Sequence, residues 1–189
     1  MNVADTEIVA SVLENSGYTA AENLQGADVI LLNTCAIREG AEQKIWNKLG
    51  SLYWAEKQRR KSVRVGVLGC MAERVKEKML EHKVVDLVAG PDAYRDLPRL
   101  LSLLDSDSTE DAMNVQLSQD ETYADILPVR RDKESLHAWI SIMRGCNNMC
   151  SFCIVPFVRG RERNRPATSI IDEVKHLRDE GVREITLLG

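Results

Sequence analysis

The 189-residue sequence predicts an α/β protein built around a parallel sheet. Short, nearly continuous apolar runs alternate with amphipathic segments of helical length, which is the pattern of strands joined by crossover helices. In two places a cysteine directly follows such an apolar run. Parallel sheets bind ligands beyond the carboxyl ends of their strands, so these cysteines would lie at the binding edge. The sequence therefore predicts a repeated unit of strand, cysteine and helix.

Composition and charge narrow the class of protein. Apolar residues make up 44% of the chain and charged residues 29%, as in globular domains, and no apolar run of about 18 residues occurs, so we expect no membrane span. Five cysteines are an odd number, which favours thiolate ligands in a reducing compartment over a secreted disulfide framework. The formal net charge of -4 gives no general attraction to nucleic acid, so RNA binding would need a local basic patch.

Helices and strands are expected to alternate through a first domain at residues 1–104. Helices are recognised by apolar residues that recur on one face, and strands by short apolar runs that suit a sheet buried on both faces. The expected helices span residues 1–16, 41–57, 73–82 and 93–104. The expected strands span residues 27–34, 63–68 and 84–88. We expect Asp5 or Thr6 to cap the first helix.

The composition changes twice in the second half of the chain. Residues 105–135 are rich in Asp, Ser, Thr, Glu and Gln, and we interpret them as a linker with one short strand near residues 113–117. A second domain follows at residues 136–189. Its expected strands, at 137–143 and 184–188, flank a helix that Thr168 or Ser169 would cap. One such unit cannot close a barrel, so we expect this chain to be truncated.

Three cysteines lie close together at the start of the second domain. Cys146, Cys150 and Cys153 form a C-x3-C-x2-C array directly after the strand expected at 137–143. A structural zinc site needs four protein ligands, and no histidine lies at a finger or ribbon spacing. Three thiolates instead suit a 4Fe-4S cluster held at three corners, whose remaining iron is open to a small molecule. The alternative is a chance triplet in a zinc-binding or thiol-rich loop.

The array and its flanks resemble the signature of the radical S-adenosylmethionine enzymes. The resemblance rests on the cysteine spacing, on Phe152 directly before the third cysteine, and on the preceding residues 140–145. It implies a cluster on Cys146, Cys150 and Cys153 whose open iron binds S-adenosyl-L-methionine. It also implies that an electron from a flavodoxin- or ferredoxin-type donor cleaves the sulfonium to a deoxyadenosyl radical.

Cys35 and Cys70 each follow a strand of the first domain. A lone buried cysteine is usually a small apolar residue, and that interpretation stays open for both. Their equivalent placement after two strands of one sheet favours ligation, because helix amino termini at that edge stabilise thiolates. The residues alone therefore favour a second metal-binding pair.

Residues 1–7, 33–35 and 68–72 resemble the methylthiotransferases, a branch of the radical S-adenosylmethionine enzymes. The resemblance implies a flavodoxin-like first domain with an auxiliary 4Fe-4S cluster on three cysteines, two of which match Cys35 and Cys70. The third belongs to a Gly-Cys-Gln segment that would precede this chain, so that cysteine and the first strand of the sheet are expected to be missing. The second domain would be the first βαβ unit of a radical S-adenosylmethionine partial TIM barrel.

Residues 90–98, 120–125 and 159–163 are most similar to members that convert isopentenylated adenosine beside the tRNA anticodon to its 2-methylthio form. The resemblance implies that the radical takes hydrogen from C2 of the adenine and that a second S-adenosyl-L-methionine supplies the methyl group. Bacterial and mitochondrial members match, so the bacterial cytoplasm or the mitochondrial matrix is implied. Two alternatives stay open: a non-catalytic module that binds a partner such as a kinase regulatory subunit, and a simple iron-sulfur electron carrier.

Four arginines at alternating positions follow the cysteine array. They are Arg159, Arg161, Arg163 and Arg165. Cations at this spacing in an irregular segment can contact RNA phosphates. The same side chains can instead form ion pairs that fix the cysteine loop at the domain boundary, and the sequence does not separate the two interpretations.

Overall fold

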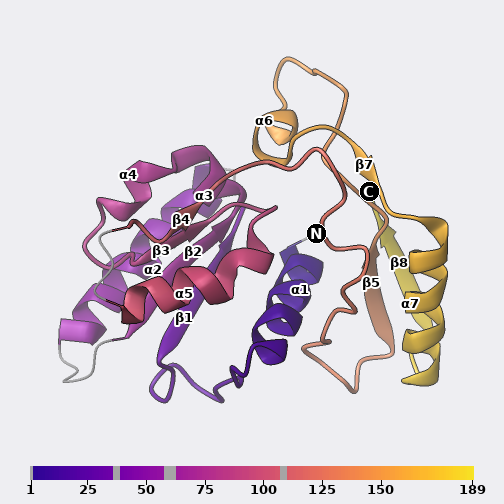
Figure 1. The fold of residues 1–189 in the computed structure, drawn as a ribbon, viewed down its shortest axis with the longest axis horizontal. Coiled ribbons are helices and arrows are strands. Elements are labelled where there is room, and N and C mark those ends of the chain that lie inside the picture. Colours follow the sequence, from indigo (N-terminus) through magenta and orange to yellow (C-terminus); the bar gives the residue numbers. More distant parts are fainter. Residues whose placement is uncertain (1, 36–38, 58–62, 107–109) are drawn as a thin grey trace.

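A computed structural model describes residues 2–35, 39–57, 63–106 and 110–189 and shows a mixed α/β protein (Figure 1). A parallel sheet with helices on both faces forms one side of the molecule. A smaller strand pair with one long helix forms the other side, and α1 lies between them. The predicted fold class, α/β with a parallel sheet, is confirmed.

The larger sheet is parallel throughout and follows the order of the chain. Its strands are β1 (Val29–Thr34), β2 (Arg64–Gly69), β3 (Leu87–Ala89) and β4 (Met113–Asn114). Parallel strands of this kind need crossover connections, which the intervening helices supply. The strand predicted near residues 113–117 is present as the two residues of β4, which pair with β3.

Helices cover both faces of this sheet, as its apolar strands require. The helices of one face are α1 (Asn2–Asn15) and α5 (Leu97–Asp105), which is preceded by the 3-10 turn η1 (Tyr94–Asp96). Those of the other face are α2 (Glu39–Lys57), α3 (Cys70–Val75) and α4 (Glu77–Leu80). Leu68 packs toward α1 and α5, whereas Val67 packs toward α2 and α3, because successive side chains of a strand point to opposite faces.

The helix predicted at residues 73–82 is wrong in its extent. The chain turns at Gly69 and becomes helical at Cys70, so α3 starts three residues earlier than expected. Lys76 then has a φ of 52°, which lies in the left-handed region and interrupts the ladder of helical hydrogen bonds. The break lets Met71 from α3 and Met79 from α4 fill the same core.

Two predicted helix caps are also wrong. Helix α1 already includes Asn2 to Thr6, so Asp5 lies within the helix, where it is fully buried. Met1, at the start of the predicted helix, lies outside the described residues. The second case is α7 (Ala167–Asp179), which begins after Pro166 without a side-chain cap. Ser169 instead donates its hydroxyl to the carbonyl oxygen of Ala124.

The second domain contains one parallel strand pair and one short antiparallel pair. Strands β5 (His137–Ser141) and β8 (Glu184–Leu188) are parallel, and α7 crosses between them over a small core of Ala138, Ile140, Leu177 and Val182. The strand predicted at 184–188 is confirmed, and the one predicted at 137–143 is divided into β5 and β6 (Met143–Arg144). Strand β6 pairs antiparallel with β7 (Arg163–Asn164).

The segment interpreted as a linker packs against the first sheet. Tyr123 is 2% exposed and stacks on Tyr94, with 5.6 Å between ring centroids. Its hydroxyl accepts a hydrogen bond from the Tyr94 amide and donates one to the carbonyl oxygen of Pro91. The domain boundaries at residues 104 and 135 stay a prediction. No helix within the described ranges has the length and apolar character that a membrane crossing requires.

Candidate metal centre

Cys35 and Cys70 lie at the carboxyl ends of two neighbouring parallel strands. Thr34 at the end of β1 is opposite Gly69 at the end of β2, so the next residue on each strand is a cysteine. Gly69 has a φ of 89°, and a Cβ there would lie 2.6 Å from the Thr34 carbonyl oxygen. Only glycine permits both this backbone and this approach. The sheet register therefore brings the two predicted auxiliary cysteines together.

The Cys70 thiol is buried but has a cation beside it. The residue is 2% exposed, and the Arg159 Nε donates a hydrogen bond to its Sγ across 3.1 Å. Burial raises the pKa of the Cys70 thiol, while the neighbouring guanidinium acts in the opposite direction and Cys35 adds to the increase. A cationic donor next to a buried thiol is the environment that a thiolate ligand needs.

A buried carboxyl group lies one helical turn beyond Cys70. Glu73 is 3% exposed, and its Oε2 has no hydrogen-bond partner within the described part of the chain. Burial raises the pKa of Glu73 to about 7, against the opposing effect of Lys76 at 3.6 Å. Sequence reasoning did not find this residue, because a glutamate near the start of a helix is usually exposed.

The loop with the other three cysteines begins and ends at the β6–β7 pair. Met143 pairs with Asn164 and Arg144 with Arg163, and the Cys146 amide donates a hydrogen bond to the Gly160 carbonyl oxygen at 3.1 Å. Gly145 has a φ of 73°, and a Cβ there would overlap the carbonyl oxygen of Arg161. The base of the loop is thus closed by backbone contacts that only glycine allows at residue 145.

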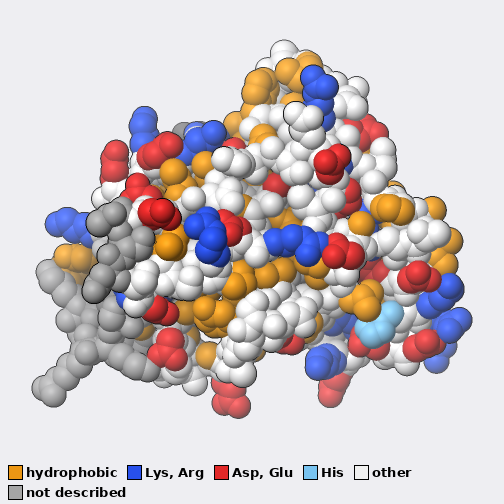
Figure 2. Space-filling model, in the orientation of Figure 1, with side chains coloured by type: hydrophobic (Ala, Val, Ile, Leu, Met, Phe, Trp, Pro, Cys, Tyr) orange, Lys and Arg blue, Asp and Glu red, His pale blue; other side chains and the backbone are white. Residues whose placement is uncertain are grey.

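Beyond this base the loop projects from the protein, above α6 (Val155–Arg159) in Figure 1. Cys150 is exposed, Phe152 is 92% exposed and Met149 is 69% exposed. Figure 2 shows apolar side chains gathered on this projecting lobe. Elsewhere on the same face, acidic and basic side chains are interspersed, without a large area of one sign.

The structure does not draw the three loop thiols together. Within residues 2–35, 39–57, 63–106 and 110–189, no three Cys, His, Asp or Glu side chains lie close enough to hold one metal ion. The donor chemistry nevertheless fits an iron-sulfur cluster, since three thiols lie within eight residues of one surface loop. The ligand role of Cys146, Cys150 and Cys153 stays a prediction.

The auxiliary pair also fits an iron-sulfur group. Arg159 donates a hydrogen bond to Cys70 through Nε. Another nitrogen of the same side chain, Nη1, is buried and has no hydrogen-bond partner among the described residues. A buried hydrogen-bond donor without a partner costs free energy. An anionic group rich in sulfide at Cys70 could accept a hydrogen bond from Arg159 Nη1. Ligation by Cys35 and Cys70 stays a prediction.

A buried aspartate joins the two cysteine regions. Asp5 on α1 accepts from Arg144 through Oδ1 at 2.9 Å and from Arg159 through Oδ2 at 2.6 Å. Arg144 also lies over the Tyr123 ring, 4.6 Å from its centroid. We call Asp5, Arg144, Arg159 and Cys70 the Asp5 network. Its members come from α1, β6, α6 and α3, so it spans both predicted domains.

The other arginines of the predicted basic segment differ in their surroundings. Arg163 pairs with Asp92 at 2.9 Å and Arg165 with Glu173 at 2.6 Å, and all four side chains are at most 7% exposed. Arg161 is exposed. Three of the four predicted RNA-contacting residues, Arg159 included, are therefore in buried ion pairs, which is the second interpretation offered by the sequence. Contact between this segment and RNA stays a prediction. Arg161 is the member of the four whose side chain is exposed.

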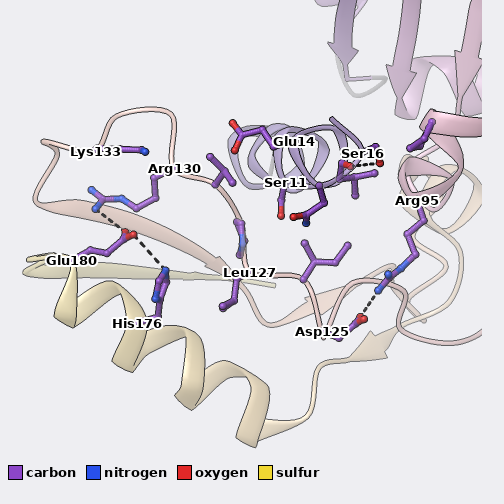
Figure 3. Close-up of a pocket in the computed structure, with 16 residues that line it drawn as sticks. Ser11, Glu14, Ser16, Arg95, Asp125, Leu127, Arg130, Lys133, His176 and Glu180 are labelled. Atoms are coloured by element: carbon purple, nitrogen blue, oxygen red, sulfur yellow. Dashed lines mark hydrogen bonds and ion pairs between the residues drawn. The ribbon is translucent and has the colours of Figure 1, made fainter. Parts of the chain in front are cut away.

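A cavity of about 690 Å³ lies away from the cysteines, between α1, residues 125–133 and α7 (Figure 3). Its charged groups largely neutralise one another, as the dashed contacts of Figure 3 show. Arg95 bonds Asp125, while Arg130 and His176 both face Glu180, each at 3.4 Å. The lining offers no set of unpaired groups that would define a ligand.

Sequence reasoning missed Asp5 and Tyr123 as parts of the site. The sequence predicts Asp5 as a helix cap, whereas in the structure it shares α1 with the buried residues Ala4, Ile8 and Val9. An acidic residue within an apolar helix face is the signal that could have revealed it, because buried carboxylates need partners. Tyr123 lies in a polar segment, and no periodicity marks it.

Comparisons with known proteins agree with this arrangement. Residues 1–90 match the family model described as uncharacterized protein family UPF0004, and residues 140–189 match the radical SAM superfamily. The whole chain is 60% identical to the tRNA-2-methylthio-N(6)-dimethylallyladenosine synthase of Chloroherpeton thalassium and covers 41% of that protein. It is 59% identical to the mitochondrial tRNA methylthiotransferase CDK5RAP1 of Rattus norvegicus and 55% identical to that of Homo sapiens, covering 33% and 34% of them.

The chain thus spans between a third and about two fifths of the length of these relatives. The UPF0004 match contains Cys35 and Cys70, and the radical SAM match contains the three cysteines of the loop. The chain thus carries a UPF0004 segment and a radical SAM segment, and across all its residues it is 55–60% identical to proteins named as tRNA-2-methylthio-N(6)-dimethylallyladenosine synthase and tRNA methylthiotransferase.

Proposed function

We propose that this chain is part of a tRNA methylthiotransferase that adds a methylthio group to C2 of N6-isopentenyladenosine near the anticodon. The observation that carries the proposal is the 60% identity, across the whole chain, to a protein named for that product. The two cysteine regions supply the ligand types that such a reaction needs, one in each matched domain.

The residues have distinct roles under this proposal. Cys146, Cys150 and Cys153 would hold the cluster that binds S-adenosyl-L-methionine, and Cys35 and Cys70 would contribute to the auxiliary cluster. When bound, the first cluster supplies one electron to S-adenosyl-L-methionine and the second lies at the source of the sulfur. The Asp5 network holds the start of the cysteine loop, at Arg144, against the first domain.

The names of the same relatives support a tRNA substrate, and the electron donor belongs to the proposal alone. The tRNA would approach the exposed side of the cysteine loop, where Arg161 offers a cation to a phosphate. An electron donor of flavodoxin or ferredoxin type would dock at the projecting loop. The compartment would be reducing, either the bacterial cytoplasm or the mitochondrial matrix, because free thiols must stay unoxidised.

A non-catalytic, partner-binding function is not favoured. Its support in the sequence is the expected truncation, with one auxiliary cysteine outside this chain, but all three cysteines of the radical motif are present. The relatives matched over the whole chain are named as synthases and methylthiotransferases. A kinase regulatory subunit is therefore not proposed as a partner.

The proposal can be tested by exchanging the matching segment of the Chloroherpeton thalassium relative for this chain. The chimera should form 2-methylthio-N6-isopentenyladenosine in tRNA, detected by mass spectrometry of digested nucleosides. A chimera with Cys150→Ala should form none, whereas one with Ser151→Ala should form product. We expect the 189 residues alone to modify no tRNA. A folded, iron-loaded chimera that leaves isopentenylated tRNA unchanged would count against the proposal.

A further inference from the structure

Arg159 contacts two partners from distant parts of the sequence. Its Nε donates to Cys70 Sγ at 3.1 Å, and its Nη2 donates to Asp5 Oδ2 at 2.6 Å. The Arg159 side chain is only 6% exposed. A planar guanidinium presents these donors at fixed angles, so one side chain sets the position of the sulfur relative to the carboxylate.

The second oxygen of Asp5 extends the same arrangement to the other cysteine region. Arg144 Nη2 donates to Asp5 Oδ1 at 2.9 Å, and Arg144 lies two residues before Cys146. Cys70 and the start of the cysteine loop are therefore held by one buried carboxylate. Buried, charge-assisted hydrogen bonds are among the stronger polar contacts in proteins.

We propose that Arg159 is a positioning residue for an iron-sulfur cluster at Cys70, and that its hydrogen bond to the ligand sulfur raises the reduction potential of that cluster. This inference rests on the proposed function, since it requires a second cluster. Through Asp5, the same side chain fixes Cys70 relative to Arg144 and the radical cysteine loop.

The direction of the effect follows from charge. Reduction adds one negative charge to the cluster and its sulfur ligands. A cationic donor on a ligand sulfur stabilises that added charge, and hydrogen bonds to sulfur and net charge are known determinants of cluster potential. The stabilisation is larger in a site screened from water, and Cys70 is 2% exposed.

The test uses the chimera described under Proposed function, in which the Chloroherpeton thalassium relative supplies the residues that precede this segment, with C146A, C150A and C153A so that the radical cysteine loop holds no cluster. The chimera is reconstituted anaerobically with iron, sulfide and 2-mercaptoethanol, and the reduction potential is measured by a redox titration followed by electron paramagnetic resonance. R159Q should lower the potential. We expect about a tenfold change in the ratio of oxidised to reduced cluster at a fixed potential, ~59 mV for one electron.

R130Q is the matched control. The Arg130 side chain is also 6% exposed and forms an ion pair, with Glu180 at 3.4 Å, but it belongs to the segment beside the cavity of Figure 3 and has no cysteine partner. R130Q should leave the potential unchanged. An equal shift in R130Q and R159Q would overturn the inference, because the effect would then be a general loss of packing.

A second measurement needs no substitution at Arg159. In the same chimera labelled with ¹⁵N-arginine, the reduced cluster should show a hyperfine coupling to a nitrogen nucleus through the hydrogen bond. Absence of that coupling would overturn the inference even if R159Q did not fold.

The outcomes separate the inference from the proposed function. An unchanged potential in R159Q with iron bound would overturn the inference and leave the proposed function standing. A triple variant that folds but takes up no iron would overturn the second cluster, and with it both the inference and that part of the proposed function.

Discussion

Asp5 and Arg144 form an ion pair of 2.9 Å in which the side chains are 1% and 3% exposed, although 139 residues separate them in sequence. The pair joins the first helix of the chain to the strand that leads into the three-cysteine loop. Removing either partner of a buried ion pair destabilises the fold, because the remaining charge would be buried without an opposite charge beside it.

Asp5→Ala should destabilise the protein strongly. The change leaves the guanidinium groups of Arg144 and Arg159 buried without their shared carboxylate, and breaking a buried pair costs roughly 3–5 kcal/mol. Urea denaturation gives the free energy of unfolding. Asp179→Ala removes an exposed partner of Arg178 and should cost less than about 1 kcal/mol. Equal costs for the two variants would contradict the buried network.

Glu73→Gln should change how stability depends on pH. The pKa of Glu73 is raised from 4.5 to about 7 in the folded protein, so between these values the unfolded state loses its proton first and the free energy of unfolding falls as pH rises. Above about pH 7, ionisation of the buried Glu73 lowers the free energy of unfolding by its full amount, on the order of 3 kcal/mol. E73Q should therefore match the parent protein near pH 4.5 and be more stable at pH 8. Urea denaturation at both pH values checks this, and parallel profiles would refute it.

Gly145→Ala should disturb the base of the cysteine loop. Its φ of 73° and its contact with the Arg161 carbonyl oxygen leave no room for a methyl group. A strained backbone position costs roughly 1–3 kcal/mol. Gly50→Ala is the control, because nothing lies within 4 Å of its Cβ position in α2 and alanine favours a helix by about 0.5–1 kcal/mol. Thermal unfolding should show opposite shifts, and a stabilised G145A would contradict the structure.

Cys150→Ala should remove the iron of the loop cluster and leave the fold intact. Cys150 is exposed, so its loss creates no cavity, but a cluster with two remaining loop ligands should not persist. We expect a loss of roughly four irons per chain after anaerobic reconstitution. Ser151→Ala, at the neighbouring exposed position, should retain them. Iron content that does not respond to C150A would reject the ligand assignment.

Arg161 and Arg163 should respond differently to the same change. Arg161→Gln should weaken tRNA binding and reduce the slope of log affinity against log salt by about 1, without affecting stability, because the side chain is exposed. Arg163→Gln should destabilise the fold instead, since it leaves Asp92 buried without its partner. Filter-binding titrations over a range of salt and urea denaturation separate the two effects. Unchanged tRNA affinity in R161Q would leave the basic segment without a nucleic-acid role.

The regular elements could largely be predicted from local pattern. The apolar runs of β1, β2 and β8 are long enough to identify strands, and the sheet is parallel because helices separate them. The break at Lys76 could not be predicted, because nothing in its identity favours a φ of 52°. The core beneath α3 and α4, filled by Met71 and Met79, accounts for that conformation.

By itself the sequence determined the α/β fold class, the spacing of Cys146, Cys150 and Cys153, the family resemblance, and the placement of Cys35 and Cys70 after strands. These depend on short-range order, which periodicity and motif spacing record. Only the tertiary structure decided what each arginine does. Arg159, Arg161, Arg163 and Arg165 look alike in sequence, but Asp5, Asp92 and Glu173 pair with three of them and leave Arg161 exposed. The difference arises because a buried charge is tolerated only where folding brings an opposite charge to it, and two of these three carboxylates come from more than 70 residues away.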